Sequence, residues 1–279
     1  MNVLLTGAHG NFGSELTRLA KNSQHIEITP IGRDGWSDLD TKLQGVDVVV
    51  HAASDLRTSA AASPTSLLDS NVMSTARLLE ASKNHRIKRW IFLSSCAVYG
   101  EDMRTDEDSV CCPITINGIS KHLNEKLVTE FCTANKIEFQ ILRVFNSYGA
   151  NDQFSIFSKL KRALQNGTPF TINNDGRMQR DFIHVSDVAA IVLHLLTANI
   201  THTHLNIGTG VATKISSVVD RVREQFPNLV VQRGNAHEAE YSRASITRLR
   251  EFWQGDFIRV EDYIRDEFAS YITTPVALR

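Results

Sequence analysis

The sequence predicts an α/β fold built on a doubly wound parallel sheet, and three observations carry this prediction. Short apolar runs alternate with segments of helical spacing from residue 2 to about residue 147. The run VDVVVH at 46–51 is nearly continuous in apolar character, as expected for a strand covered on both faces. The chain has 279 residues, enough for one large domain or two unequal ones. Alternating strands and helices imply right-handed crossovers within one parallel sheet.

Each element of the first half has its own sequence signal. The short apolar run NVLLT opens the chain, and a turn rich in glycine follows it. The next segment shows helical spacing through Phe12, Leu16 and Leu19. The same pattern analysis predicts strands at 2–6, 26–31, 46–51, 89–94 and 139–144, and helices at 12–21, 66–84 and 117–135.

The pattern changes after about residue 147. A segment of helical character at 154–166 precedes a turn and a short strand near Phe170. An apolar helix at 186–198 and a strand at 204–208 indicate a return to the parallel sheet. The remainder, 212–279, is mixed, polar and less regular. We therefore expect a smaller C-terminal portion beside the sheet.

Composition and charge exclude several classes of protein. The chain is 42% hydrophobic and 22% charged, as globular proteins are, and its net charge of −1 implies no nucleic-acid partner. The four cysteines show no disulfide spacing, which favours a reducing compartment. The first residues lack the basic and apolar regions of a signal peptide, and no apolar run approaches the ~18 residues of a membrane span. We expect a cytoplasmic protein without membrane contact.

A glycine-rich loop, GAHGNFG at 7–13, follows the first strand and opens the first helix. Its glycines Gly7, Gly10 and Gly13 suit a tight turn, a close approach of the backbone to a pyrophosphate, and helix-to-strand packing. The N-terminus of the helix then favours the phosphate charge. This placement predicts a nucleotide-binding site of the Rossmann type.

The tip of the second strand usually selects between the two nicotinamide cofactors. Here the tip reads Ile31-Gly32-Arg33-Asp34. Arg33 favours NADP because a guanidinium accommodates a 2′-phosphate, whereas an acidic residue such as Asp34 suits the free ribose of NAD. The choice between NAD and NADP stays open. Asp38 and Leu39 are the candidates for the adenine side of the site.

The motifs along the chain resemble one known group. In order they are GAHGNFG, VDVVVHAAS (46–54), LSSCAVYG (93–100), NGISK (117–121), LRVFNSYG (142–149), GRMQRDFIHVSDVA (176–189) and LNIGTG (205–210). Together they resemble the extended short-chain dehydrogenases/reductases, in particular the NAD-dependent epimerase/dehydratase family that acts on nucleotide sugars. The resemblance implies a Rossmann-type cofactor domain from 1–146 plus 184–211. It also implies a substrate-binding portion from 147–183 plus 212–279.

The resemblance implies a role for each matched position. Ser95 matches the hydroxyl that bonds the reacting oxygen of the sugar, and Lys121 matches the lysine that holds the nicotinamide ribose. Arg180 matches an arginine on the nucleotide-sugar diphosphate, where a planar guanidinium fits two phosphate oxygens. Asn146 would lie at the edge of the substrate pocket, and Asn71 would brace the site. The implied cofactor contacts are Gly7, Gly10, Asn11, Phe12, Gly13, Ala52 and Ala53.

Two departures from the family pattern bear on activity. Cys96-Ala97 stand where the dehydratases carry an Asp-Glu pair, which argues against sugar 4,6-dehydration. Asn117 stands four residues before Lys121, where the family carries its catalytic tyrosine. A phenol can give and take a proton, but an amide cannot do so near neutral pH.

Three interpretations of Asn117 remain open. The protein is an enzyme that has lost its acid–base group, or a cysteine (Cys96, Cys111 or Cys112) replaces that group, or the chain only binds its ligands. We expect an NAD(P)-dependent nucleotide-sugar epimerase or keto-sugar reductase that is impaired or atypical, with Ser95, Asn117 and Lys121 at its centre. The alternative is a non-catalytic regulatory subunit that binds NAD(P) or a nucleoside-diphosphate sugar. The family resemblance also implies a homodimer through the helices at 66–84 and 117–135.

Overall fold

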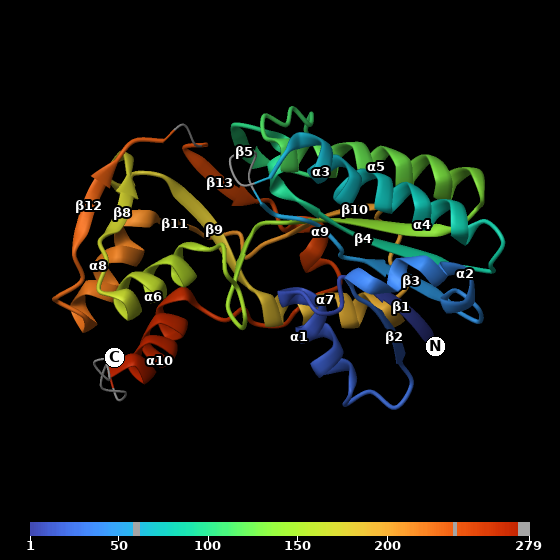
Figure 1. The fold of residues 1–279 in the computed structure, drawn as a ribbon, viewed down its shortest axis with the longest axis horizontal. Helices are drawn as coiled ribbons and strands as arrows, with labels where there is room; N and C mark the ends of the chain where they lie inside the picture. Colours follow the sequence, from blue (N-terminus) through green and yellow to red (C-terminus); the bar gives the residue numbers. More distant parts are fainter. Residues whose placement is uncertain (58–61, 237–238, 273–279) are drawn as a thin grey trace.

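The structure is a computed structural model that describes residues 1–57, 62–236 and 239–272, without the side chains of 33–34, 102–105 and 270–272. Its centre is a sheet of six parallel strands, and a parallel sheet is what the sequence predicts (Figure 1). The structure adds the strand order, which is β10-β6-β4-β3-β1-β2. Apolar side chains cover both faces of the inner strands, which is why their sequences read as continuous apolar runs. The strands are β1 (Asn2–Thr6), β2 (Glu27–Ile31), β3 (Val48–His51), β4 (Arg89–Ser95), β6 (Glu138–Val144) and β10 (His204–Ile207).

Helices pack on both faces of this sheet. One core, with Leu16 and Ile191, lies under α1 (Asn11–Ala20) and α7 (Val185–Thr197). The opposite core, with Leu78, Phe92 and Val128, lies under α4 (Ser74–Ser82) and α5 (Ile116–Ala134). The short helix α2 (Leu39–Lys42) and the 3-10 turn η1 (Arg33–Asp38) connect β2 to β3 on that second face. The doubly wound architecture is therefore confirmed.

The expected helix at 66–84 consists of three consecutive segments. These are α3 (Pro64–Leu68), a π-helical turn η2 (Asp69–Met73) and α4. The π turn coincides with Asn71, whose Oδ1 accepts a hydrogen bond from Asp55 N at 2.6 Å and whose Nδ2 donates to Asp55 O at 3.0 Å. A π turn inserts one residue into a helix and often occurs at functional sites. Asn71 thereby braces the chain that leaves β3.

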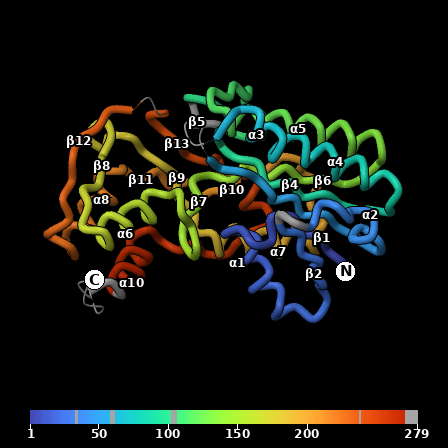
Figure 2. The backbone as a smooth tube through the Cα atoms, viewed as in Figure 1, coloured from blue at the N-terminus to red at the C-terminus, as the bar shows by residue number. Residues whose placement is uncertain are grey.

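The second part of the molecule is more regular than its sequence indicates. The sheet β11-β9-β13-β5, with β7 beside β9, contains a strand from the first half of the chain, because β5 pairs in parallel with β13. Figure 1 shows β5 beside β13, and Figure 2 traces the backbone through α6, β8, β9 and β12 in the rest of this part. The division at 146, 184 and 211 stays a prediction. The elements of this part are β5 (Asp102–Thr105), β7 (Asn146–Tyr148), α6 (Ile156–Asn166), β8 (Phe170–Asn173), η4 (Asn174–Gly176), β9 (Gln179–His184), β11 (Ala212–Lys214), α8 (Ile215–Gln225), β12 (Val231–Gly234), β13 (Tyr241–Ala244), α9 (Thr247–Arg250) and α10 (Val260–Ile272).

The outer strands of the central sheet are β2 and β10. Pro30 lies within β2 and pairs with Leu5 of β1 in the register of the two strands. At the other edge, the backbone N–H of Asn206 in β10 donates to Glu107 Oε1 at 2.9 Å. Across the ranges that the structure describes, no helix combines the length and apolar character needed to cross a membrane.

Candidate active site

The glycine loop lies directly on the turn that follows β3. Gly7 has a φ of +70°, which favours glycine, and a Cβ added there would lie 2.8 Å from Ala53 N. Thr6 Oγ1 accepts hydrogen bonds from the backbone N–H groups of Ala52 and Ala53, each at 3.2 Å. Gly10 N donates to Gly7 O at 2.9 Å and closes the loop. The structure thus brings together the predicted cofactor residues of β1 and β3.

Asn11 and Phe12 use their side chains for structure. Asn11 Nδ2 donates to Gly149 O at 3.1 Å, and Asn11 Oδ1 accepts from Asn151 N at 2.9 Å. Phe12 packs against the core under α1. Their backbone N–H groups lie in the first turn of α1, where amides have no partner within the helix and can face a phosphate. The cofactor contacts expected of these two residues are therefore backbone contacts, and they stay predictions.

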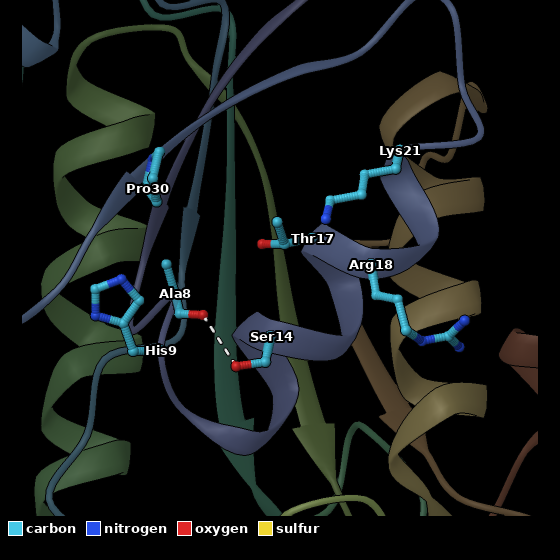
Figure 3. Close-up of a pocket in the computed structure, with 7 residues that line it drawn as sticks. All are labelled: Ala8, His9, Ser14, Thr17, Arg18, Lys21 and Pro30. Carbon is cyan, nitrogen blue, oxygen red and sulfur yellow. Dashed lines mark hydrogen bonds between the residues drawn. The ribbon is translucent and has the colours of Figure 1, made fainter.

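A groove of about 310 Å³ runs beside the glycine loop, between α1 and β2 (Figure 3). His9 and Pro30 line one side of it, and Thr17 and Arg18 of α1 line the other, together with Lys21 just past the end of that helix. The His9 imidazole lies over the tip of β2, because a Cβ added to Gly32 would lie 2.6 Å from His9 Nδ1. His9 Nδ1 therefore lies beside the tip of β2, the segment that the sequence connects with the choice of cofactor.

The remaining cofactor predictions on this side divide into three outcomes. The side chain of Arg33 lies outside the part of the structure that is described. Asp38 is exposed at the end of η1. Leu39 is buried and packs in the core beside Ile31 and Leu43, so its side chain contributes to the fold. The adenine side of the site stays a prediction.

The predicted catalytic residues come from β4 and the first turns of α5. Ser95 ends β4, and its Oγ accepts a hydrogen bond from Ala97 N at 3.2 Å, which caps the 3-10 turn η3 (Cys96–Tyr99). Thr115 caps α5 by accepting from Gly118 N at 3.1 Å. A Cβ added to Gly118 would lie 2.4 Å from Ala97 O, so α5 begins in direct contact with η3. This close approach brings Asn117 to the turn that Ser95 caps.

Lys121 is buried beneath this turn. Its Nζ donates to Leu93 O at 2.6 Å and lies 5.0 Å from the centre of the Phe92 ring. Burial lowers the pKa of Lys121 to about 8, and the nearby Glu125 carboxylate acts in the opposite direction. The Lys121 ammonium is therefore fixed between the Phe92 ring and the carbonyl oxygen of Leu93.

Asn117 leaves a polar atom unused. It lies four residues before Lys121, so the two side chains share one face of α5. Its Oδ1 is buried and accepts no hydrogen bond from the residues that the structure describes. A buried acceptor without a partner costs about 1–3 kcal/mol. The site thus carries an acceptor, and no titratable group, at the position expected for the phenol.

The cysteines are poor substitutes for that phenol. Burial raises the pKa of Cys96 to about 12, and burial also raises the pKa of Cys111. A thiol acts as a base or nucleophile only as the thiolate, which neither residue forms readily near neutral pH. The interpretation in which one of these two cysteines replaces the tyrosine loses its support.

The predicted substrate residues lie on the neighbouring strands β7 and β9. Asn146 Nδ2 donates to Asp181 O at 2.8 Å and to Ser242 Oγ at 3.1 Å, so its amide joins β7, β9 and β13. Arg180 Nη1 donates to Gln179 O at 3.0 Å. The Asp181 carboxylate accepts from the backbone of Gly210 and Ala244 and from Thr209. The contacts of Asn146 and Arg180 with substrate stay predictions.

A buried ion pair behind Lys121 has no counterpart in the sequence-based prediction. Glu125 and Arg143 form a bidentate pair, with Nη2 to Oε2 at 2.9 Å and Nε to Oε1 at 3.1 Å. Ser94 Oγ donates to Glu125 Oε1 at 2.5 Å, and Arg143 Nη1 donates to Tyr99 Oη and Glu107 O, each at 3.0 Å. The only hint in the sequence is that Glu125 follows Lys121 by four residues. The pair anchors α5 to the end of β4 and to β6.

A parallel sheet of the Rossmann type with a glycine loop after β1 is the fold of the extended short-chain dehydrogenases/reductases. Residues 3–208 match the NAD dependent epimerase/dehydratase family, and the chain belongs to that family.

Relatives agree with this assignment. The chain is 32% identical over 255 residues to a putative UDP-glucose 4-epimerase of Methanocaldococcus jannaschii, covering 80% of this chain and 82% of the relative. MoeE5, solved in complex with UDP-glucuronic acid and NAD, is 26% identical with a TM-score of 0.86, over 97% of this chain and 100% of that one. The UDP-glucuronic acid 4-epimerase of Bacillus cereus, at 24% identity, shows the same fold with a TM-score of 0.88, over 96% and 98% of the two chains.

Proposed function

We propose that this protein is an NAD(P)-dependent nucleotide-sugar epimerase or keto-sugar reductase with impaired or atypical proton transfer. The observation that carries the proposal is the packing of α5 on η3. That packing brings the helix that carries Asn117 and Lys121 against the turn that Ser95 caps, with the contact of Gly118 on Ala97 O fixing the approach.

The residues fit a dinucleotide at the carboxyl ends of the strands. The backbone of the glycine loop and the first turn of α1 would hold the pyrophosphate, and Lys121 would hold the nicotinamide ribose. When bound, the cofactor supplies hydride transfer at a sugar carbon. Ser95 would bond the reacting oxygen, and Arg180 would hold the diphosphate of a nucleoside-diphosphate sugar. Asn117 can donate or accept a hydrogen bond there, but it cannot carry the proton.

One observation favours a second function, a non-catalytic binding subunit. Asn117 Oδ1 has no hydrogen-bond partner among the described residues, and the pKa of Cys96 is raised to about 12. Both facts leave the site without an evident proton carrier. In this alternative the bound nucleotide sugar acts as a signal or a cargo and is released unchanged.

Turnover of a panel of UDP-sugars by the wild type and by Asn117→Tyr separates these functions. Loss of a general acid–base group costs about 10²–10⁴-fold in rate, so Asn117→Tyr should raise the turnover rate by a factor of that order. Asn117→Phe is the matched control, because it fills the same space without a hydroxyl. No turnover by any form, with tight binding of cofactor and UDP-sugar by all of them, supports the binding subunit. Failure of every form to bind cofactor contradicts both functions.

We infer that the cofactor is NAD or NADP, with a preference for NADP. Two observations support this preference. Arg33 directly follows Gly32 in the sequence, and a guanidinium accommodates a 2′-phosphate. The His9 imidazole lies over Gly32. Titration of the protein with NADH and with NADPH, followed by cofactor fluorescence, measures it directly. Arg33→Ala should weaken NADPH binding by about tenfold, the effect of ~1.4 kcal/mol, and leave NADH binding unchanged. Equal losses for both cofactors would contradict the role of Arg33.

We propose a homodimer formed through the helical stretch at 66–84, which consists of α3, η2 and α4, and through α5. Leu68 and Met73 on the first helical stretch and Ile119 and Leu123 on α5 are exposed apolar side chains on neighbouring helices. Analytical ultracentrifugation at micromolar concentration should show a dimer for the wild type and a monomer for Leu123→Glu. Val230→Glu, at an exposed valine before β12, is the matched control and should remain dimeric. A monomeric wild type contradicts the proposal.

We also propose a cytoplasmic location. Cys96, Cys111, Cys112 and Cys132 are all free thiols in the structure. Free thiols persist in reducing compartments. Fractionation that places the protein outside the cytoplasm would refute this proposal.

A further inference from the structure

Three potential metal ligands, Cys111, His122 and Glu125, meet at the N-terminal half of α5. Cys111 comes from the loop before the helix, and His122 and Glu125 lie three residues apart on α5, so they share a face. One ligand atom from each residue lies within 4.8 Å of the other two. His122 Nδ1 and Glu125 Oε2 are 3.9 Å apart.

The imidazole of His122 has one ring nitrogen that the described residues leave without a hydrogen-bond partner. Its Nδ1 is buried and makes no hydrogen bond to any residue in the described ranges. A buried ring nitrogen left without a partner carries a desolvation cost of about 1–3 kcal/mol. Metal coordination would satisfy this atom, since neutral imidazole binds zinc through either ring nitrogen.

We propose that Cys111, His122 and Glu125 bind a zinc ion. Thiolate, imidazole and carboxylate are the three ligand types that zinc takes from proteins. Zinc–ligand bonds of about 2.0–2.3 Å in a tetrahedral site place the ligand atoms roughly 3.3–3.7 Å apart. The ligand atoms lie within 4.8 Å of one another, so they reach that arrangement by a contraction of about 1.5 Å or less, through side-chain rotation. Cys111 and His122 are only half-buried, so the fourth position can be water.

Arg143 does not prevent binding. Glu125 Oε1 already accepts from Ser94 Oγ and Arg143 Nε, whereas Oε2 accepts from Arg143 Nη2 alone and keeps a free lone pair. On binding, the Cys111 thiol releases its proton to solvent and a zinc–sulfur bond forms. The thiolate then offsets one of the two charges of the ion, and the Glu125 carboxylate is shared between the ion and Arg143. Arg143 keeps its bonds to Tyr99 and Glu107, so its guanidinium orients the carboxylate toward the metal.

The position of the ion defines its effect. It would join the loop before α5 to the helix itself, one residue beyond Lys121. Cys112 of the same loop packs on Gly100, because a Cβ added to Gly100 would lie 2.1 Å from Cys112 O. Zinc would therefore fasten the segment that leads from η3 to the site helix. The role of the zinc ion is therefore structural. It is the same whether the candidate active site converts a nucleotide sugar or only binds it.

Metal-free full-length protein, titrated with Zn²⁺ in competition with a chromogenic chelator, tests the proposal. We expect one zinc per chain and a rise in Tm on binding. With Co²⁺ as the probe, a thiolate-to-metal absorption band should appear in the near ultraviolet. Cys111→Ser and His122→Gln should each lose at least tenfold in zinc affinity and lose the rise in Tm. Cys112→Ser, which removes the exposed neighbouring thiol, should behave as the wild type.

Three results would overturn the proposal. The first is that the wild type takes up no stoichiometric zinc. The second is that Cys111→Ser binds zinc with the affinity of the wild type. The third is that only Cys112→Ser loses zinc affinity. Circular dichroism of each metal-free variant checks that it is folded. The half-buried His122 provides a second, independent variant should the Cys111 substitution disturb the loop.

Discussion

Acidification from pH 7 to pH 5 should lower the free energy of unfolding by about 2 kcal/mol through His51 alone. The ring of His51 is fully buried, with Nδ1 2.6 Å from Thr6 Oγ1 and Nε2 2.8 Å from Thr75 Oγ1. Thr6 Oγ1 accepts from two backbone N–H groups, so its proton goes to His51 Nδ1. Thr75 Oγ1 donates to Asn71 O and therefore accepts from His51 Nε2. Both threonines thus favour the neutral ring.

The magnitude follows from the pKa. Burial lowers the pKa of His51 to about 3, with a smaller contribution from Lys121. In the unfolded chain the ring takes up a proton near pH 6.5. Between these values the unfolded state binds more protons than the native state, so stability falls as the pH falls. The loss is about 2 kcal/mol at pH 5 and approaches about 5 kcal/mol near pH 3, at ~1.4 kcal/mol per pH unit.

Urea denaturation at pH 7 and pH 5, on the wild type and on His51→Gln, isolates this contribution. Other groups titrate in the same range: burial lowers the pKa of His184 and raises the pKa of Asp187 to about 6. Their contributions have opposite signs and are common to both proteins. The variant should be less stable at pH 7, but its stability should change by about 2 kcal/mol less between the two pH values. His25→Gln, at an exposed histidine, is the control. Equal pH dependence in wild type and His51→Gln would refute the reasoning.

Two further predictions concern the anchoring of α5. Arg143→Met should cost about 3–5 kcal/mol in the free energy of unfolding, because it leaves the Glu125 carboxylate buried without its cation. Arg265→Met, at an exposed ion pair on α10, is the control and should cost less than about 1 kcal/mol in the free energy of unfolding. Similar costs for the two variants would contradict the role of Arg143 as the buried counter-charge of Glu125. Gly118→Ala should cost about 1–3 kcal/mol and weaken cofactor binding, since the added methyl group forces α5 away from Ala97 O. Glu130→Ala, at an exposed position on the same helix, is the control. If Gly118→Ala matches this control in stability and in cofactor affinity, the contact with Ala97 O does not have the proposed role.

The sequence predicted the central sheet well because its strands carry their own signal. The inner strands are buried on both faces, so their apolar runs stand out in the sequence. Strands β5, β7 and β11 have three or four residues and little alternation, so nothing local marks them. The π turn at Asn71 escaped prediction for another reason. It depends on a pairing with Asp55, sixteen residues away, which only the folded chain creates.

The site divides along the same line. The glycine loop, Ser95 and Lys121 could be placed from the sequence, because each belongs to a motif that fixes its own local geometry. The pairing of Glu125 with Arg143 joins a helix to a strand eighteen residues away, and no local pattern predicts it. For Asn11, the local motif indicated a role that differs from the contacts of its side chain. Its position in the loop indicated a ligand contact, whereas its side chain ties the loop to Gly149 and Asn151.

The two edges of the central sheet have a consequence for how copies of this chain can associate. An open strand edge can recruit a strand from another molecule, which leads to fibre-like growth. Pro30 removes a backbone donor from the free edge of β2, and the Glu107 carboxylate occupies the outward N–H of Asn206 on β10. Both routes to growth by strand addition are therefore obstructed. Self-association is left to side-chain surfaces, where it can stop at a closed pair of subunits.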